Sequence, residues 1–187
     1  MADIRVYKVV LLGNGGSGKT TWVTRLTTGE YQPRYIATLG VEVTEYRQSL
    51  SDGTTIAFSL YSTSGTDSTA TTQGSPSEGY LMGADAVMIF LDGSTSLARQ
   101  QDSLTRWRDF AHRICPSSPV MLVASKHDLP QHMRLENAYS VSSYTCYGLQ
   151  TPLSNLTRKL TGNQSIRFVE NPPIRPAEVT LESIRVS

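Results

Sequence analysis

One stretch of the sequence decides the fold: Gly13-Asn14-Gly15-Gly16-Ser17-Gly18-Lys19-Thr20. It matches the pattern G-x-x-x-x-G-K-[ST] in full. Its glycines let successive backbone N–H groups turn inward and form a nest for an anion. A helix that begins at its end adds a positive N-terminus. Lys19 can reach the β- and γ-phosphates of a nucleotide, and the Thr20 hydroxyl can ligate Mg²⁺. The stretch therefore predicts a phosphate-binding loop.

The sequence on either side supports this interpretation over a glycine-rich turn with an incidental lysine. Residues 5–12 (RVYKVVLL) form a short apolar run rich in β-branched side chains, which predicts a buried strand. Residues 21–28 predict a helix that ends at Gly29. A strand, a phosphate loop and a helix in this order are what the phosphate-binding mechanism requires.

The remaining elements predict an α/β fold. Strands are predicted at residues 41–50 and 55–61, joined by the hairpin turn Ser51-Asp52-Gly53, and at residues 86–91, 119–124 and 139–141. Helices are predicted at residues 96–114 and 147–160, the second ended by Gly162, whereas residues 129–138 are too few for a helix. The apolar side chains on or near one face of the first of these helices are Leu97, Leu104, Trp107, Phe110 and Ile114. Strands that alternate with helices predict a doubly wound sheet.

Two segments are predicted to lie outside this framework. Residues 62–77 consist mostly of Ser, Thr, Gly and Ala and carry one charge, Asp67, which indicates a long loop. Residues 171–187 contain Pro172, Pro173 and Pro176 and indicate an extended arm. We therefore expect a single domain over residues 1–170 and a proline-containing arm over residues 171–187.

Composition excludes several classes of protein. The 187 residues, 39% of them apolar and 18% charged, fit one globular domain with one sizeable core. A formal net charge of +1 requires neither a nucleic-acid nor a membrane partner. Cys115 and Cys146 are expected to be reduced thiols, and the three histidines do not stand at zinc-ligand spacing. We expect no membrane anchor, because residue 2 is Ala2 and the last residues offer no cysteine to prenylate.

A second motif, Ser125-Lys126-His127-Asp128, follows the strand predicted at residues 119–124. It resembles the N/T-K-x-D loop of small G proteins. That resemblance implies that Asp128 accepts hydrogen bonds from N1–H and the exocyclic amine of guanine, and that the stem of Lys126 packs along the base. Ser125 replaces the usual Asn or Thr and has less reach, so we expect weaker affinity with guanine preference retained. Taken alone, such a motif is more often a solvated loop, but its spacing from the phosphate loop favours guanine.

The resemblance becomes specific in Tyr35-Ile36-Ala37-Thr38-Leu39-Gly40-Val41-Glu42-Val43. These residues are similar, almost one for one, to switch I of the Ran type of small GTPase in the Ras superfamily. Gly29-Glu30-Tyr31 and Trp107-Arg108-Asp109 also follow the Ran pattern. The similarity covers nearly the whole chain, with gaps, and identifies it as a divergent member of this family.

The resemblance implies a P-loop NTPase fold of the small G-protein type, with a mostly parallel sheet of about six strands flanked by helices and one antiparallel edge strand. It implies GTP or GDP with Mg²⁺, Thr20 and Thr38 as metal ligands, and Thr38 as the sensor of the γ-phosphate. It further implies a monomer of the nucleus and cytoplasm that engages transport receptors of the importin-β type through switch I. The residues expected at the nucleotide are Gly13, Asn14, Gly15, Gly16, Ser17, Gly18, Lys19, Thr20, Thr21, Tyr31, Tyr35, Thr38, Gly65, Ser125, Lys126, Asp128, Ser142, Ser143 and Tyr144.

The sequence departs from the family where hydrolysis is catalysed. The family reads D-T-A-G-Q after its third strand, and this chain reads Ser62-Thr63-Ser64-Gly65-Thr66. A neutral Ser62 cannot neutralise Mg²⁺ as a carboxylate does, so we expect weaker Mg²⁺ binding. Thr66 is too short to orient water as the family glutamine does, although Gly65 keeps a backbone N–H for the γ-phosphate. The expected catalytic set is therefore Thr66, Gly65 and Lys19. An alternative alignment would assign the missing carboxylate to Asp67.

Three functions remain open on this reasoning. The first is a slow GTPase switch in nuclear transport. The second is a non-hydrolysing module that mimics Ran toward transport receptors, which the changes at Ser62 and Thr66 favour. The third is a P-loop kinase for a small substrate, against which the Ser125–Asp128 loop and the Ran-like switch I both argue.

Overall fold

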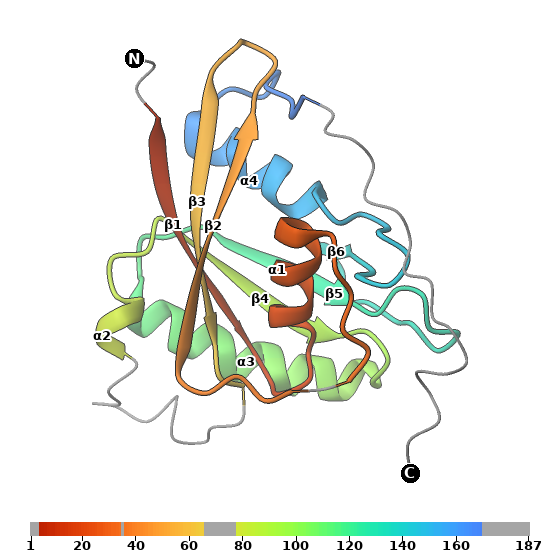
Figure 1. Ribbon diagram of the computed structural model, residues 1–187. Helices are drawn as coiled ribbons and strands as arrows, with labels where there is room; N and C mark the ends of the chain where they lie inside the picture. Colours follow the sequence, from red (N-terminus) through yellow and green to blue (C-terminus); the bar gives the residue numbers. More distant parts are fainter. Residues whose placement is uncertain (1–3, 35, 66–77, 170–187) are drawn as a thin grey trace.

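The computed structural model describes residues 4–34, 36–65 and 78–169, with the backbone alone for Tyr80. Six strands form one sheet in the order β2-β3-β1-β4-β5-β6 (Figure 1). The strands are β1 (Arg5–Gly13), β2 (Val41–Ser49), β3 (Thr55–Thr63), β4 (Ala86–Asp92), β5 (Val120–Ser125) and β6 (Ala138–Ser140). Only β2 runs antiparallel, against β3, and every other neighbouring pair is parallel. This is the mostly parallel sheet with one antiparallel edge strand that the resemblance to small G proteins implies.

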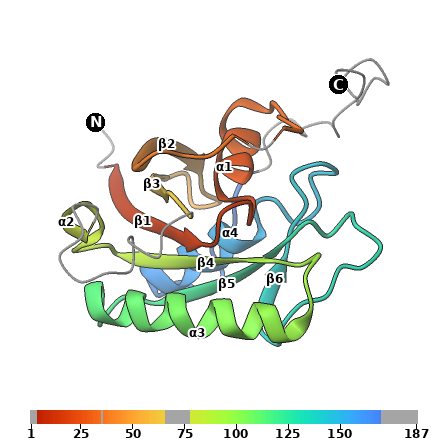
Figure 2. The ribbon, with the colours of Figure 1, turned by 90° about the horizontal axis from the view of Figure 1, so that it is seen from below.

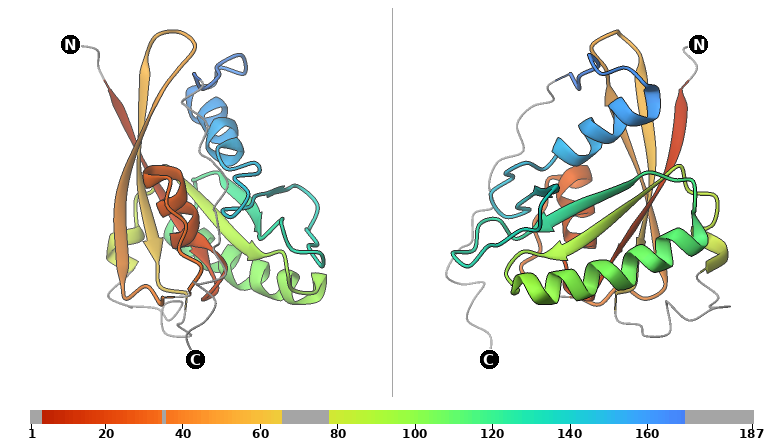
Figure 3. Two further views of the ribbon diagram at one scale, coloured as in Figure 1. Left: turned by 45° about the vertical axis from the view of Figure 1, so that its right-hand side comes forward. Right: turned by 180° about the vertical axis from the view of Figure 1, so that it is seen from behind.

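The helices are divided between the two faces of the sheet. They are α1 (Lys19–Thr28), α2 (Glu78–Leu81), α3 (Leu97–Ile114) and α4 (Thr151–Thr161). Figure 2 shows α3 running along one face, and Figure 3 shows α1 and α4 on the opposite side. The carboxyl ends of the parallel strands meet at one edge of this sandwich, where ligands bind in open α/β sheets.

The side chains of the central strands point alternately to the two faces of the sheet and fill a separate core on each face. In β4, Ala86, Met88 and Phe90 belong to the core beneath α1 and α4, whereas Val87, Ile89 and Leu91 belong to the core beneath α3. Successive side chains of a strand point to opposite faces, so a strand covered on both sides is apolar throughout. The apolar run at residues 86–91 was predictable as a buried strand for this reason.

Several expected boundaries are wrong. Ser62 and Thr63 belong to β3 and not to the following loop, because β3 pairs with both β1 and β2 along its length. Helix α4 begins at Thr151, four residues later than expected, because Gly148 lies in the left-handed region (φ 61°) and Pro152 occupies the first turn. Leu97 was expected on the buried face of α3 but is 44% exposed at its first residue.

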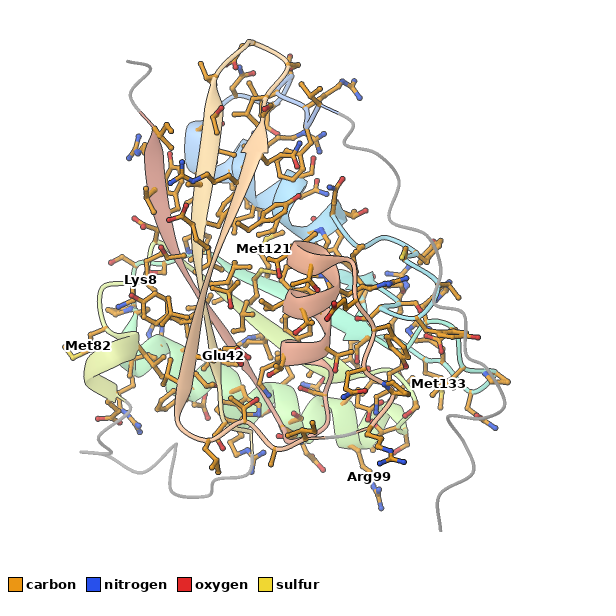
Figure 4. All side chains as sticks on the ribbon, viewed as in Figure 1. Lys8, Glu42, Met82, Arg99, Met121 and Met133 are labelled. Atoms are coloured by element: carbon orange, nitrogen blue, oxygen red, sulfur yellow. The ribbon has the colours of Figure 1, made fainter. Side chains whose placement is uncertain are left out.

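Short helix α2 was not expected, and contacts with β1 hold the turn that follows it. The Lys8 ammonium donates to the Met82 carbonyl at 2.7 Å, and the two side chains lie on the same side of the molecule in Figure 4. The Lys8 backbone N–H donates to Asp85 at 2.8 Å. These bonds fix the chain as it enters β4.

The connection from β5 to β6 contains turns and no helix, as its length predicts. It is tied to the start of α3: the Met133 N–H donates to the Gly93 carbonyl at 2.7 Å, and Gln100 donates to the Met133 carbonyl at 3.1 Å. Neither Cys115 nor Cys146 forms a disulfide. No helix in the described part of the chain is long and apolar enough to cross a membrane. The expected proline-containing arm at residues 171–187 lies outside the described residues.

Candidate nucleotide-binding site

The phosphate loop connects β1 to α1 at the carboxyl edge of the sheet. Gly16 and Gly18 have φ values of 73° and 87°, which side chains rarely tolerate. A Cβ on Gly13 would lie 2.4 Å from the Phe90 carbonyl, so the loop also needs glycine to pass over β4. No side chain caps the N-terminus of α1, and its first turn carries no acidic residue. The first N–H groups of α1 are thus free of a side-chain cap and favour an anion, which fits a phosphate group.

Lys19 is buried within this loop, with 5% of its surface exposed. Its ammonium donates to the carbonyls of Gly13 (2.7 Å) and Asn14 (3.0 Å) and lies 3.4 Å from the Ser17 hydroxyl. Burial lowers the pKa of Lys19 from its usual value to about 8. The two carbonyls thus hold the Lys19 ammonium within the phosphate loop.

Three hydroxyl groups from three separate segments converge beside the loop. The Thr20 Oγ1 lies 2.7 Å from the Thr38 Oγ1 and 3.1 Å from the Ser62 Oγ. Thr38 comes from switch I and Ser62 from β3, so the expected metal ligands and the aligned Ser62 do meet. The distance from Ser62 to Thr20 supports the alignment that places Ser62 at the family aspartate; Asp67, the alternative, lies outside the described residues.

These three hydroxyl oxygens are of the element that Mg²⁺ prefers as a ligand, but none of them carries a negative charge. Magnesium sites in proteins use carboxylates together with substrate phosphates, and hydroxyl groups contribute no charge. Within residues 4–34, 36–65 and 78–169, no group of three or more His, Cys, Asp or Glu side chains is arranged to hold a metal ion. Glu42, the register partner of Ser62, is solvent-exposed. The residues here therefore do not fit an Mg²⁺ ion held by the protein's own charge.

The end of β3 is in direct contact with the phosphate loop. The Gly15 N–H donates to the Gly65 carbonyl at 2.7 Å. A Cβ on Gly65 would lie 2.3 Å from both the Asn14 carbonyl carbon and the Gly15 nitrogen. Only glycine can make this approach, which gives a structural reason for Gly65 in a segment that departs from the family at Ser62, Ser64 and Thr66.

The loop after β5 places Asp128 and Lys126 as a pair of fixed side chains. Lys126 has a positive φ of 61°, and its ammonium lies 2.6 Å from Asp92 at the end of β4. The Ser142 hydroxyl donates to Asp128 at 2.5 Å and accepts from the Thr145 N–H at 3.0 Å. Asp128 is thereby oriented from the Ser142-Ser143-Tyr144 segment, which the sequence assigns to the same base-binding site.

Asp92 was not recognised from the sequence. Burial alone would raise the pKa of Asp92, but hydrogen bonds from Lys126 and Ser94 outweigh burial and hold the pKa below its usual value. Asp92 therefore stays ionised and fixes Lys126. The sequence did contain a signal for Asp92. Asp92 is a carboxylate at the end of β4, and β4 and β5 are parallel neighbours that end at the same edge of the sheet.

Two tyrosines from different segments contact each other near Asp128. The rings of Tyr31 and Tyr144 are 5.5 Å apart at an interplanar angle of 55°. Burial, followed by the negative charge of Asp128, raises the pKa of Tyr31, so Tyr31 and Asp128 are close. The structure thus brings Tyr31, from the segment after α1, to the loops that follow β5 and β6.

Other expected residues are found elsewhere or cannot be placed. The side-chain oxygen of Asn14 does not point into the loop; it accepts from Trp107 at 2.8 Å and from Arg106, both on α3. Thr21 lies in the first turn of α1 and Ser143 in the loop after β6, both half-buried. Tyr35, expected at the nucleotide, and Thr66, expected in the catalytic set, lie outside the described residues.

A histidine pair beside the base loop was also missed by the sequence. The Nδ1 atoms of His127 and His132 are 3.3 Å apart, and the His127 ring stacks on Tyr147 at 4.2 Å. Burial and the neighbouring His127 lower the pKa of His132. The two histidines are five positions apart in a segment without a helix, so no periodicity could have paired them.

A mostly parallel α/β sheet, a phosphate loop after β1 and a K-x-D loop after β5 define a P-loop protein of the guanine-nucleotide-binding class. Among known protein families, residues 8–128 match the family described as Roc, "Ras of Complex, Roc, domain of DAPkinase". This match spans more than half of the 187 residues and includes both loops. The chain belongs to this family of Ras-like GTPase domains and is a GTP-binding switch protein of the Ras superfamily.

Proposed function

We propose that the chain is a Ran-like guanine-nucleotide switch in which GTP hydrolysis is impaired. The observation that carries the proposal is the convergence of Thr20, Thr38 and Ser62. This geometry supports a switch I that responds to the nucleotide through Thr38, while Ser62 provides no carboxylate at the metal position. Hydrolysis of this type depends on positioning and electrostatics, so losing the carboxylate and the family glutamine slows chemistry more than binding.

In this proposal the phosphate loop and Lys19 hold the phosphates, and Asp128 with Lys126 selects guanine. Thr20 and Thr38 are the residues that would hold Mg²⁺ together with the nucleotide phosphates, and without a carboxylate at position 62 the ion would be held weakly. Tyr31 and Tyr144 cover the base, which offsets the shorter reach of Ser125. The Ran-type sequence of switch I supports a role in nucleocytoplasmic transport for a monomer found in nucleus and cytoplasm.

Switch I also supports a second candidate function, a non-hydrolysing module that competes for transport receptors of the importin-β type. Ile36, Leu39 and Val43 are 69%, 91% and 53% exposed. Apolar side chains so exposed beside one another in sequence are typical of a protein-binding surface. A fixed GTP-bound state would present this surface permanently.

The first test is the identity of the nucleotide carried by freshly purified protein, released by denaturation and separated by chromatography. We expect GTP, because the site binds but turns over slowly. GDP would contradict impaired hydrolysis. A competition titration of GTP against ATP then tests base selection: Asp128→Ala should abolish the preference for GTP, with Asp109→Ala on α3 as the matched control. An unchanged preference in Asp128→Ala would refute the assigned base loop.

A further inference from the structure

The Thr20, Thr38 and Ser62 hydroxyls, hereafter the hydroxyl latch, connect switch I directly to the phosphate-loop helix and to β3. A backbone bond lies alongside: the Ser64 N–H donates to the Gly40 carbonyl at 2.8 Å. Switch I is therefore joined to α1 at Thr38 and to the end of β3 at Gly40 by side-chain and backbone hydrogen bonds.

The chemistry of three hydroxyls makes the latch self-sufficient. Each hydroxyl has one proton to donate and two lone pairs to accept with. The central Thr20 can accept from one neighbour and donate to the other, so both contacts are satisfied together. A carboxylate at position 62 has no proton when ionised and would add negative charge beside bound phosphates. Such a carboxylate would need a cation to offset its charge, whereas the neutral hydroxyl of Ser62 needs none.

The latch is built on a rigid base. Ser62 is 2% exposed, and its neighbour Thr63 donates from its hydroxyl to the Leu11 carbonyl at 2.9 Å. Gly65 accepts from the Gly15 N–H at 2.7 Å. Consecutive residues of the β3 end are thus bonded to the phosphate-loop helix, β1, switch I and the phosphate loop. Ser62 is buried, and both of the contacts that Thr20 makes are part-buried, so water competes for these hydrogen bonds less than it would at an exposed site.

We propose that the hydroxyl latch replaces the metal ion in holding switch I closed, so that guanine nucleotide is retained whether or not Mg²⁺ is present. Ser62 is the positioning residue of this device, and it acts through Thr20 on Thr38. The inference rests on the proposed nucleotide binding, and it deepens that function by making closure independent of the metal.

The test measures release of a fluorescent GDP analogue from the full chain, chased with excess unlabelled GDP, in millimolar Mg²⁺ and in excess EDTA. We expect the two release rates to agree within about threefold. Ser62→Asp restores a carboxylate that needs a cation, so its release should accelerate at least tenfold in EDTA. Ser59→Ala removes a hydroxyl from the same strand outside the latch and should behave as the unmodified protein.

A second readout examines the latch without nucleotide. Amide hydrogen exchange of residues 36–43 is followed in nucleotide-free protein in EDTA. Ser62→Ala and Thr38→Ala should each accelerate exchange of this segment several-fold, and Ser59→Ala should not. Melting curves of all variants identify any that fail to fold. Thr38→Ser keeps the hydroxyl, so residues 36–43 of this variant should exchange as slowly as in the unmodified protein.

Two results would overturn the inference. One is a tenfold or greater acceleration of nucleotide release by EDTA in the unmodified protein. The other is exchange of residues 36–43 that is the same in Ser62→Ala, Thr38→Ala and Ser59→Ala. If the protein binds no guanine nucleotide, the proposed function fails, and the exchange measurement alone decides whether the latch exists.

Discussion

The buried ammonium of Lys19 makes nucleotide affinity depend on pH in a window where a lysine ordinarily does not titrate. In the free protein burial lowers the pKa of Lys19 to about 8. Nucleotide phosphates beside the ammonium favour its charged form, so the pKa of the bound state lies higher. Binding above pH 8 must therefore take up a proton, and affinity is full below pH 8 and falls as pH rises above it.

The magnitude follows from the charged fraction of Lys19. With a pKa of about 8, roughly nine-tenths of the free protein carries the charge at pH 7 and roughly one-tenth at pH 9. Since only the charged form binds phosphates well, the dissociation constant for GDP should rise about tenfold between pH 7 and pH 9, which corresponds to about 1.4 kcal/mol.

The assay is a fluorescence or calorimetric titration of GDP at constant ionic strength from pH 6.5 to pH 9.5. Guanine itself titrates at the alkaline end, so Lys19→Arg serves as the matched variant because its guanidinium stays charged throughout. The ratio of the two pH profiles isolates the lysine. If that ratio stays within twofold from pH 7 to pH 9, the reasoning from burial of Lys19 is refuted.

Two further perturbations test the catalytic defect and the close approach of β3. Ser62→Asp combined with Thr66→Gln should raise single-turnover GTP hydrolysis about tenfold or more, because well-placed polar groups are each worth roughly 10²–10³ in rate; no gain would locate the defect elsewhere. Gly65→Ala puts a Cβ 2.3 Å from Asn14 and Gly15 backbone atoms and should lower the free energy of unfolding by about 1–3 kcal/mol. Denaturant titration should show no such loss for Gly79→Ala, whose added Cβ meets nothing within 4 Å.

Local rules were enough for most of the fold. The apolar runs at residues 5–12 and 86–91 predicted central strands because both faces of those strands are covered. Gly29 and Gly162 predicted helix ends, and both adopt the left-handed conformation that ends a helix. The start of α4 and the end of β3 were misjudged, since the first depends on the conformation of Gly148 and the second on strand pairing.

The candidate site was predictable in part. Chain order placed the phosphate loop after β1 and the K-x-D loop after β5, and parallel strands bring such loops to one edge. Ser62 was recognised as a lost carboxylate, but its bond to Thr20 was not foreseen. Asp92 and the histidine pair were missed, because their partners are 34 and 5 residues away with no periodic pattern to connect them.

The sequence by itself determined the phosphate loop, the base loop, the order of the elements and the absence of a family carboxylate at position 62. Each of these is written in adjacent residues or in an apolar period, so local chemistry suffices. Only the tertiary structure decided that Thr20, Thr38 and Ser62 meet, that Gly65 touches the phosphate loop and that Lys19 is buried. These contacts join segments up to 50 residues apart, and their geometry exists only after β1, β2 and β3 have paired into one sheet.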